Sequence, residues 1–225
     1  MTAKTGMLSR RIVLGGALTA VATSGFAPAL AALRAATPAQ TTGPFYPAVK
    51  PLDDDNDLTL VRGRDGRAAG KPIEVAGRVT DRQGRPVRAA VVEIWQCNAF
   101  GRYHHPRDAR DAPLDPYFQG HGRNVTDEAG AYRFRTIQPP PYPASANWMR
   151  PAHIHFAVAG PGFEPLVTQM YFAGDPHLER DYVFNSIRDP AARASVVVTL
   201  RPPSAAPGGP AVATAVFDIV LPVAG

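Results

Sequence analysis

Two histidines stand two positions apart in the apolar run MRPAHIHFAVAG, residues 149–160. Side chains alternate between the faces of an extended strand, so His153 and His155 should point to one face and Ile154 to the other. Neutral imidazoles are common metal ligands. The pair therefore predicts half of a metal site, with the remaining ligands supplied from elsewhere in the chain. The alternative is a polar strand face with two hydrogen-bonded histidines.

The other ligand candidates are histidines, carboxylates and two loop tyrosines. A zinc site would favour a further His or Cys, and a ferrous site a carboxylate, so Asp175 and His177 are candidates for these metals. Tyr103 in GRYHH and Tyr142 in PPPYPAS are unusual candidates. A phenol with a pKa of about 10 binds well only to a strongly Lewis-acidic ion such as Fe(III), as the phenolate. Residue types alone leave the metal open. The further histidines in loops are His104, His105 and His121.

Seven segments rich in β-branched and aromatic residues are predicted to be strands. They span residues 72–79, 89–96, 131–137, 153–159, 165–172, 194–200 and 215–221. The pattern Val-Thr-Asp-x-x-Gly occurs at 79–84 and again at 125–130, and is typical of type I hairpin turns. This spacing predicts an all-β fold with a β-sandwich core. Little helix is expected beyond a helical turn at 189–197.

Two long segments between the predicted strands, 97–124 and 138–151, are expected to be loops. Loops of this length in a compact domain are usually functional or disordered. These two contain aromatic residues and histidines rather than the Ser, Glu and Lys typical of disorder, which favours active-site loops.

The first 36 residues are predicted to be a signal peptide, leaving residues 37–225 as the mature domain. A basic start is followed by an apolar stretch at 12–22 and by small residues at Ala29 and Ala31. Arg10 and Arg11 resemble the twin-arginine export signal. The apolar stretch is too short to span a bilayer comfortably. We therefore expect export to the periplasm or the extracellular space, without a stable membrane anchor.

The mature chain is nearly neutral and holds one cysteine. The formal net charge of +5 falls to +2 without residues 1–32, which carry three basic residues and no acidic one. This balance gives no support for nucleic-acid binding. A single cysteine, Cys97, excludes an internal disulfide.

Five motifs along the chain, taken in order, resemble the intradiol ring-cleavage dioxygenases. The motifs are EIWQCNAFGRYHH, PLDPYFQGHGR, TDEAGAYRFRTIQPPPYP, RPAHIHF and TQMYFAGDP. They are most similar to the protocatechuate 3,4-dioxygenase group and its iron-bearing β subunit. QTTGPFYP at 40–47 is similar to that family's N-terminal segment. The resemblance thus covers residues 40–221, nearly the whole predicted mature chain.

The resemblance implies one non-haem Fe(III) per chain, bound by two tyrosines and two histidines. The family's Gly-Arg-Tyr motif falls on Tyr103, the equatorial tyrosine, and its Pro-Tyr-Pro motif falls on Tyr142, the axial one. Its Arg-Pro-Ala-His-Ile-His motif falls on His153, the axial histidine, and on His155, the equatorial one. On this interpretation the two histidines share a strand face because together they hold the iron.

The resemblance also implies the reaction, in which O₂ cleaves a catechol-type diol between its two hydroxyl-bearing carbons to give a cis,cis-muconate. Tyr142 is expected to leave the metal and take up a substrate proton. Arg150 is expected to stabilise negative charge on the ring, and Gln169 to be a polar pocket residue. Ala144 and Met149 depart from the protocatechuate pattern, which usually has Trp in place of Ala144. The natural diol therefore stays open.

The expected partners are the small-molecule diol and O₂. The resemblance leaves open a homo-oligomer or a partner subunit that completes the pocket. An alternative of a different class is an exported, non-catalytic, transthyretin-like binding module. Such a module has no use for two tyrosinate ligands, so the presence of the whole ligand set together with Arg150 argues against it.

Overall fold

The structure is a computed structural model that describes residues 1–3, 33–47, 49–51, 53–203 and 211–222. The twin-arginine motif and the rest of the predicted signal segment through residue 32, apart from residues 1–3, lie outside the described residues. The fold lies within residues 32–225, which form one unit by themselves.

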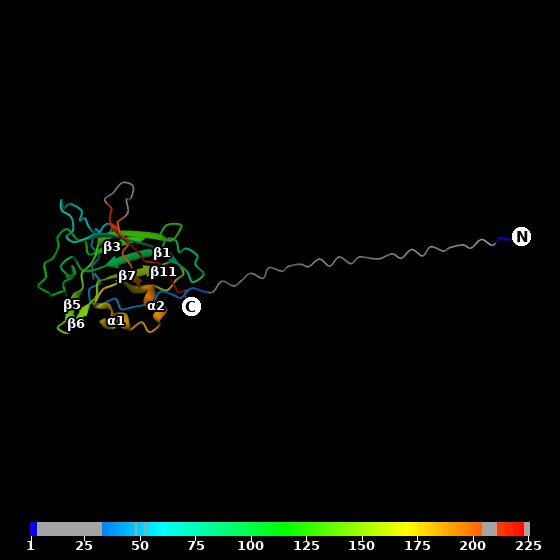
Figure 1. The fold of residues 1–225 in the computed structure, drawn as a ribbon. Helices are drawn as coiled ribbons and strands as arrows, with labels where there is room; N and C mark the ends of the chain where they lie inside the picture. Colours follow the sequence, from blue (N-terminus) through cyan, green and yellow to red (C-terminus); the bar gives the residue numbers. More distant parts are fainter. Residues whose placement is uncertain (4–32, 48, 52, 204–210, 223–225) are drawn as a thin grey trace. The chain divides into compact units, whose positions relative to one another are not determined.

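Two β-sheets carry the fold (Figure 1). In the first, β1 pairs antiparallel with β4 and parallel with β10 and β11. The second has the order β3-β2-β7-β8-β9, and β5 and β6 form a separate hairpin. The strands are β1 Pro72–Thr80, β2 Val91–Trp95, β3 His121–Val125, β4 Ala131–Ile137, β5 Tyr142–Ser145, β6 Trp148–Arg150, β7 His153–Ala159, β8 Leu166–Phe172, β9 Val197–Val198, β10 Ala213–Val216 and β11 Ile219–Val220.

Alternating apolar residues of both sheets form one core between them. Phe134 on β4 and Phe156 on β7 are fully buried in it. The ring of Phe156 lies 5.0 Å from that of Phe217 and 6.1 Å from that of Tyr132, so side chains of the two sheets interdigitate. The predicted all-β sandwich is confirmed.

The outer face of the second sheet carries the polar side chains of β7. His155 lies opposite Trp95 on β2 and opposite Gln169 on β8, and His153 lies opposite Tyr171. Residues directly opposite each other on paired strands share a face. Ile154, in contrast, points into the apolar core. The side chains of β7 therefore alternate between the two faces as predicted, and both histidines lie on the outer face.

Five of the predicted strands are observed within one or two residues of their expected bounds, as β1, β2, β4, β7 and β8. The prediction of a strand at 194–200 is wrong over its first half, because α2, Pro190–Ser195, runs into it before β9. The predicted strand at 215–221 is interrupted between β10 and β11. There Asp218 Oδ1 accepts a hydrogen bond from the Arg78 backbone N–H at 2.9 Å, in place of a strand carbonyl.

The predicted loops contain strands that their composition concealed. Segment 97–124 ends in β3, whose HGRNV sequence has one β-branched residue, and segment 138–151 contains the β5–β6 hairpin. Short helices follow β8, namely η1 Leu178–Arg180 and α1 Tyr182–Asn185. Figure 1 shows α1 at the same end of the domain as β5 and β6. None of the helices in the described part of the chain is long and apolar enough to cross a membrane.

Candidate metal centre

Four side chains from three parts of the chain meet on the outer face of the second sheet. His153 and His155 come from β7, Tyr103 from the loop after β2, and Tyr142 from the first position of β5. Each is at most 5% exposed. The two imidazole centroids are 4.9 Å apart, and the Tyr142 ring lies 5.5 Å from His153 and 5.6 Å from Tyr103. The structure thus brings together the four side chains predicted to bind the metal.

The His153 ring is oriented by the backbone just before β7. Its Nδ1 lies 2.7 Å from the carbonyl oxygen of Pro151, which can only accept, so Nδ1 carries the proton. The unprotonated Nε2 then lies 3.3 Å from the hydroxyl oxygen of Tyr103. Histidines that bind metals commonly donate their other N–H to a backbone carbonyl in this way.

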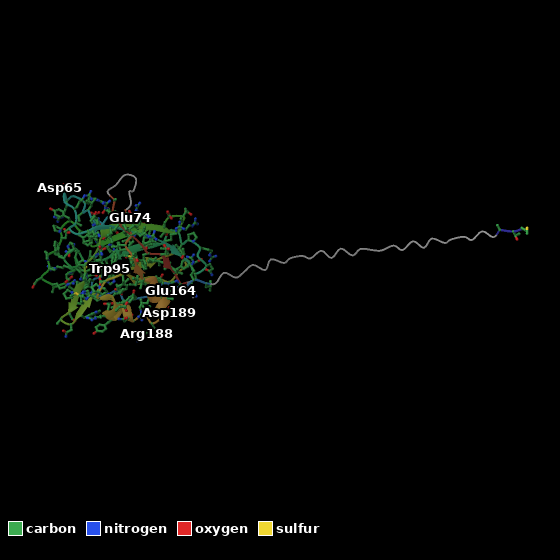
Figure 2. The ribbon with its side chains drawn as sticks, viewed as in Figure 1. Asp65, Glu74, Trp95, Glu164, Arg188 and Asp189 are labelled. Carbon is green, nitrogen blue, oxygen red and sulfur yellow. The ribbon has the colours of Figure 1, made fainter. Side chains whose placement is uncertain are left out.

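The His155 ring is held between a tryptophan and a glycine. It stacks on Trp95 with centroids 4.8 Å apart and an interplanar angle of 10°, and Figure 2 shows Trp95 within the body of the domain. A Cβ on Gly43 would lie 3.3 Å from His155 Cε1, and Gly43 has a φ of +71°, so any side chain there would be strained. His155 Nδ1 is buried without a hydrogen-bond partner among the described residues.

Burial controls the protonation of all four donors. Burial and the nearby Arg150 guanidinium hold the pKa values of His153 and His155 well below the ordinary value, so both rings are neutral and have a free lone pair. Burial and the neighbouring Tyr142 raise the pKa of Tyr103 well above its usual range. Burial also raises the pKa of Tyr142, against the opposing charge of Arg150. Without a metal both tyrosines are phenols at neutral pH.

This donor set fits a ferric ion. Binding must release two protons from buried phenols, which requires a strongly Lewis-acidic ion. The zinc and ferrous alternatives lack their ligands, because within the described ranges no three His, Cys, Asp or Glu side chains gather into a metal site. The Asp175 carboxylate accepts the backbone N–H groups of Ala152 and His177, each at 2.8 Å. The Asp175 carboxylate therefore stabilises the turn after β8 instead of facing the two histidines.

Arg150, at the end of β6, is buried and hydrogen-bonded to two side chains. Its Nε donates to Asp181 Oδ2 at 2.7 Å, and its Nη2 donates to Gln169 Oε1 at 2.6 Å. Asp181 is fully buried, and its Oδ1 caps α1 by accepting the N–H of Phe184 at 2.7 Å. Its Oδ2 also accepts the indole N–H of Trp148 at 3.2 Å. The start of α1 thus supplies the counter-charge that holds Arg150 at the site.

Gln169 is a positioning residue in this arrangement. Its Oε1 accepts from Arg150 and, at 3.1 Å, from the Tyr171 hydroxyl, while its Nε2 donates to the carbonyl oxygen of Thr41 at 3.0 Å. Both ends of the amide are therefore engaged by the protein. Gln169 orients Arg150 and anchors the N-terminal segment to β8.

That N-terminal segment, residues 40–45, covers the donors. Gln40 Nε2 donates to the Tyr171 hydroxyl at 2.8 Å, and Phe45 stacks on Tyr103 with centroids 4.8 Å apart. Arg107 Nη2 donates to the carbonyl oxygen of Pro44 at 2.7 Å. The cover excludes water from one side of the cluster.

A second arginine lies against the ring of Tyr142. The Arg110 guanidinium carbon is 4.2 Å from the centroid of the Tyr142 ring. Arg110 is paired with the buried Asp108 carboxylate, whose Oδ2 also accepts the backbone N–H of Tyr103 at 2.7 Å. This ion pair links the loop after β2 to the β5–β6 hairpin and fixes both tyrosines relative to each other.

Sequence reasoning pointed to the four clustered side chains and Arg150 but missed the residues that position them. Trp95 and Gln40 lie inside segments that carry the family resemblance but were assigned no role, and Asp181 lies outside every motif. Trp95 ends β2, a predicted strand, just before the loop that carries Tyr103, so strand alternation could have indicated the face on which its ring lies. Asp181 could have been found only as a helix cap. His104 is exposed, and His105 accepts the Arg107 backbone N–H through Nδ1 at 3.1 Å, so neither joins the donors.

Comparison with known proteins yields a family match over most of the chain. A family profile described as Dioxygenase matches residues 41–223. The protocatechuate 3,4-dioxygenase beta chain of Burkholderia cepacia is 51% identical over 140 residues, covering 61% of this chain and 60% of that protein. Catechol 1,2-dioxygenase 2 of Acinetobacter lwoffii is 34% identical over 187 residues, covering 76% of this chain and 64% of that protein. The chain thus spans less than two thirds of both relatives.

A solved structure with a similar fold is hydroxyquinol 1,2-dioxygenase from Pseudomonas putida DLL-E4. It superposes with a TM-score of 0.65 and 29% sequence identity, covering 85% of this chain and 68% of that chain. The dioxygenase domain of a carbohydrate-binding fusion protein from Streptomyces sp. SirexAA-E is covered completely, with a TM-score of 0.62, 28% identity and 84% of this chain covered.

Proposed function

Because the chain belongs to the intradiol dioxygenase family, we propose that it cleaves a catechol-type aromatic diol between the two hydroxyl-bearing carbons with O₂. The family uses iron, and we propose one Fe(III) per chain bound by Tyr103, Tyr142, His153 and His155. The observation that supports this most strongly is the buried cluster of two neutral imidazoles and two phenols, with His153 Nδ1 already engaged by a backbone carbonyl. When bound, ferric iron supplies a Lewis acid that chelates the diol and activates its ring toward O₂.

The protein's own residues would handle protons and charge. The phenolate oxygen of Tyr142 would accept one diol proton as the substrate binds. Arg150, held by Asp181 and Gln169, would stabilise the negative charge that develops on the ring. Because Asp181 and Gln169 already hold the Arg150 guanidinium, it would not have to move as charge develops on the ring. Segment 40–45 would keep bulk water away from the ring.

The substrate is expected to be a single-ring diol that can carry substituents. Ala144 is exposed on the β5–β6 hairpin and Met149 is 38% exposed. Met149 pairs with Pro143, one position along from the Tyr142–Arg150 pair, so its side chain points away from these two residues, and Ala144 is too small to crowd a ring substituent. We therefore expect catechols with alkyl or chloro groups to be accepted as well as catechol, hydroxyquinol and protocatechuate.

The test is O₂ consumption by the iron-loaded chain with this panel of diols, followed by mass spectrometry of the products. The expected product is a muconate formed without added reductant. The matched controls are His155→Ala, which removes a proposed ligand, and His177→Ala, which lies outside the site. No O₂ uptake with any diol by iron-replete protein, or cleavage beside the diol, would refute the proposal. A protein that binds diols unchanged would favour the non-catalytic binding module.

We also propose that the chain is exported by the twin-arginine route and functions in the periplasm or outside the cell. The support is the Arg10–Arg11 pair ahead of a short apolar stretch. The backbone N–H of Arg34 donates to the carbonyl oxygen of Arg82 at 2.8 Å. Cleavage near residue 32 would keep this contact, whereas cleavage after residue 36, the predicted end of the signal peptide, would remove it.

A further inference from the structure

Arg110, in the loop after β2, carries a charge to which the proposed reaction gives no role. Its guanidinium carbon lies over three aromatic rings, 4.2 Å from the centroid of Tyr142, 5.5 Å from that of Phe45 and 5.9 Å from that of Tyr103. The Arg110 side chain is 21% exposed. A cation within about 6 Å of an aromatic centroid is attracted to the ring, and the attraction is stronger where water is excluded. Both predicted tyrosine ligands therefore lie within reach of one positive charge.

The Asp108 carboxylate holds the guanidinium in this place. Arg110 Nε donates to Asp108 Oδ1 at 2.7 Å, and Arg110 Nη2 donates to Asp108 Oδ2, so the pair is bidentate. Asp108 is buried, and its Oδ2 also accepts the backbone N–H of Tyr103 at 2.7 Å. The guanidinium cannot turn away from the Tyr142 ring without breaking two charged hydrogen bonds.

The contact between Arg110 and Tyr142 gains strength when the phenol becomes a metal ligand. A neutral ring offers the guanidinium only its quadrupole, whereas a phenolate offers a full negative charge. Opposite charges interact more strongly in a largely buried site than in water, and the Tyr142 side chain is almost completely buried. The arginine charge is present at every ordinary pH. Arg110 therefore favours an anionic Tyr142 ligand more than it favours the free phenol.

We propose that Arg110 is a positioning residue of the metal centre, which holds the Tyr142 ring by its face and stabilises it as an anionic ligand. This inference rests on the proposed function, which assigns Tyr142 to the iron. Arg110 acts through Tyr142, whereas Arg150 is expected to act on the substrate ring. Because Asp108 partly neutralises Arg110, removing the arginine and removing the carboxylate should affect the ligand in opposite directions.

The test reads the charge around the tyrosine ligands from the visible absorption band of the iron-loaded, full-length protein. Light of this band moves an electron from a phenolate to the ferric ion, so a positive charge beside the phenolate raises the energy of the band. Arg110→Met should therefore move the band to longer wavelength. Asp108→Asn leaves the guanidinium less neutralised and should move the band to shorter wavelength. Arg110→Lys keeps the charge, so its band should stay close to that of the wild type.

Arg110→Met leaves the Asp108 carboxylate buried without its counter-charge, so the double variant Asp108→Asn/Arg110→Met is measured beside it. The double variant buries no unpaired charge, and the asparagine can still accept the N–H of Tyr103. Its affinity for Fe(III), measured by competition with nitrilotriacetate, should fall about tenfold, as expected for loss of a largely desolvated cation–ring contact. The matched control is Arg102→Met, which removes hydrogen bonds to the carbonyl oxygens of Ala112, at 2.8 Å, and Asp108, at 3.4 Å, in the same loop. The control should change neither the band nor the affinity.

Band shifts in the same direction for Arg110→Met and Asp108→Asn would indicate a purely structural role and overturn the proposal. Wild-type iron affinity in the double variant, or an equal loss of affinity in Arg102→Met, would also overturn it. A wild-type chain that binds Fe(III) without a visible band would overturn both this proposal and the proposed metal centre. A coloured wild type that cleaves diols, with a band that no Arg110 variant moves, would overturn this proposal alone.

Discussion

Replacing Arg150 with methionine should destabilise the fold by about 3–5 kcal/mol, the usual effect of leaving a buried charge without its partner. The Arg150 and Asp181 side chains are 6% and 0% exposed, and their closest atoms are 2.7 Å apart. Methionine fills much of the arginine volume, so the dominant loss is electrostatic. The Asp181 carboxylate would retain only the N–H groups of Phe184 and Trp148 as donors.

The expected loss can be expressed as a melting temperature. In a protein of this size, 1 kcal/mol corresponds to about 2–4 °C, so Arg150→Met should lower the Tm by about 6–20 °C. Urea unfolding of the metal-free protein, followed by circular dichroism, gives the free energy directly, and an unchanged m-value would show that both states keep their compactness.

A second substitution separates the charge effect from the packing effect. Asp181→Asn in the Arg150→Met background removes the orphaned charge, and asparagine can still cap α1. The double variant should therefore recover a large part of the lost stability. It should not recover turnover, because the proposed stabilisation of charge on the substrate ring needs the guanidinium.

The reasoning would be refuted if Arg150→Met alone cost less than about 1 kcal/mol, the value typical of an exposed ion pair. It would also be refuted if Asp181→Asn made the Arg150→Met protein less stable still. Recovery of full activity in the double variant would remove Arg150 from the proposed reaction while leaving its structural role intact.

Three further predictions concern the ligands, pH and export. Tyr142→Phe should retain iron but change the visible absorption band, and should lower kcat/KM by about 10²–10⁴-fold through loss of a proton acceptor, as measured by spectroscopy and steady-state kinetics; unchanged kinetics would contradict the role. Burial lowers the pKa of His121 below its ordinary value of about 6.5, so at lower pH the unfolded chain binds a proton that the folded chain does not. The free energy of unfolding should therefore fall as the pH drops from about 7 to about 5, and a His121→Phe variant with the same pH slope in urea unfolding would refute this. Changing Arg10 and Arg11 together to lysine should trap the precursor in the cytoplasm on cell fractionation, and continued export would rule out the twin-arginine route.

The sequence alone determined the elements whose pattern is local. Strand alternation put His153 and His155 on one face, and segments 131–137 and 153–159 became β4 and β7 with the expected bounds. The motifs around Tyr103 and Tyr142 implied the metal-binding tyrosines only through their resemblance to a known family. In each case the signal lies within a few neighbouring residues, because the two-residue repeat of a strand and the residues of a short motif both fit within so short a segment.

Only the tertiary structure decided what surrounds those donors. Arg150 and Asp181 are 31 positions apart in the sequence with two strands between them, and no local pattern indicates that they pair. The strand β3 was hidden because HGRNV has little β propensity and is held instead by pairing with β2. That pairing places His121 opposite Trp95, an arrangement that no local sequence pattern predicts. Such contacts depend on how whole sheets and loops pack, and chain neighbours do not encode that packing.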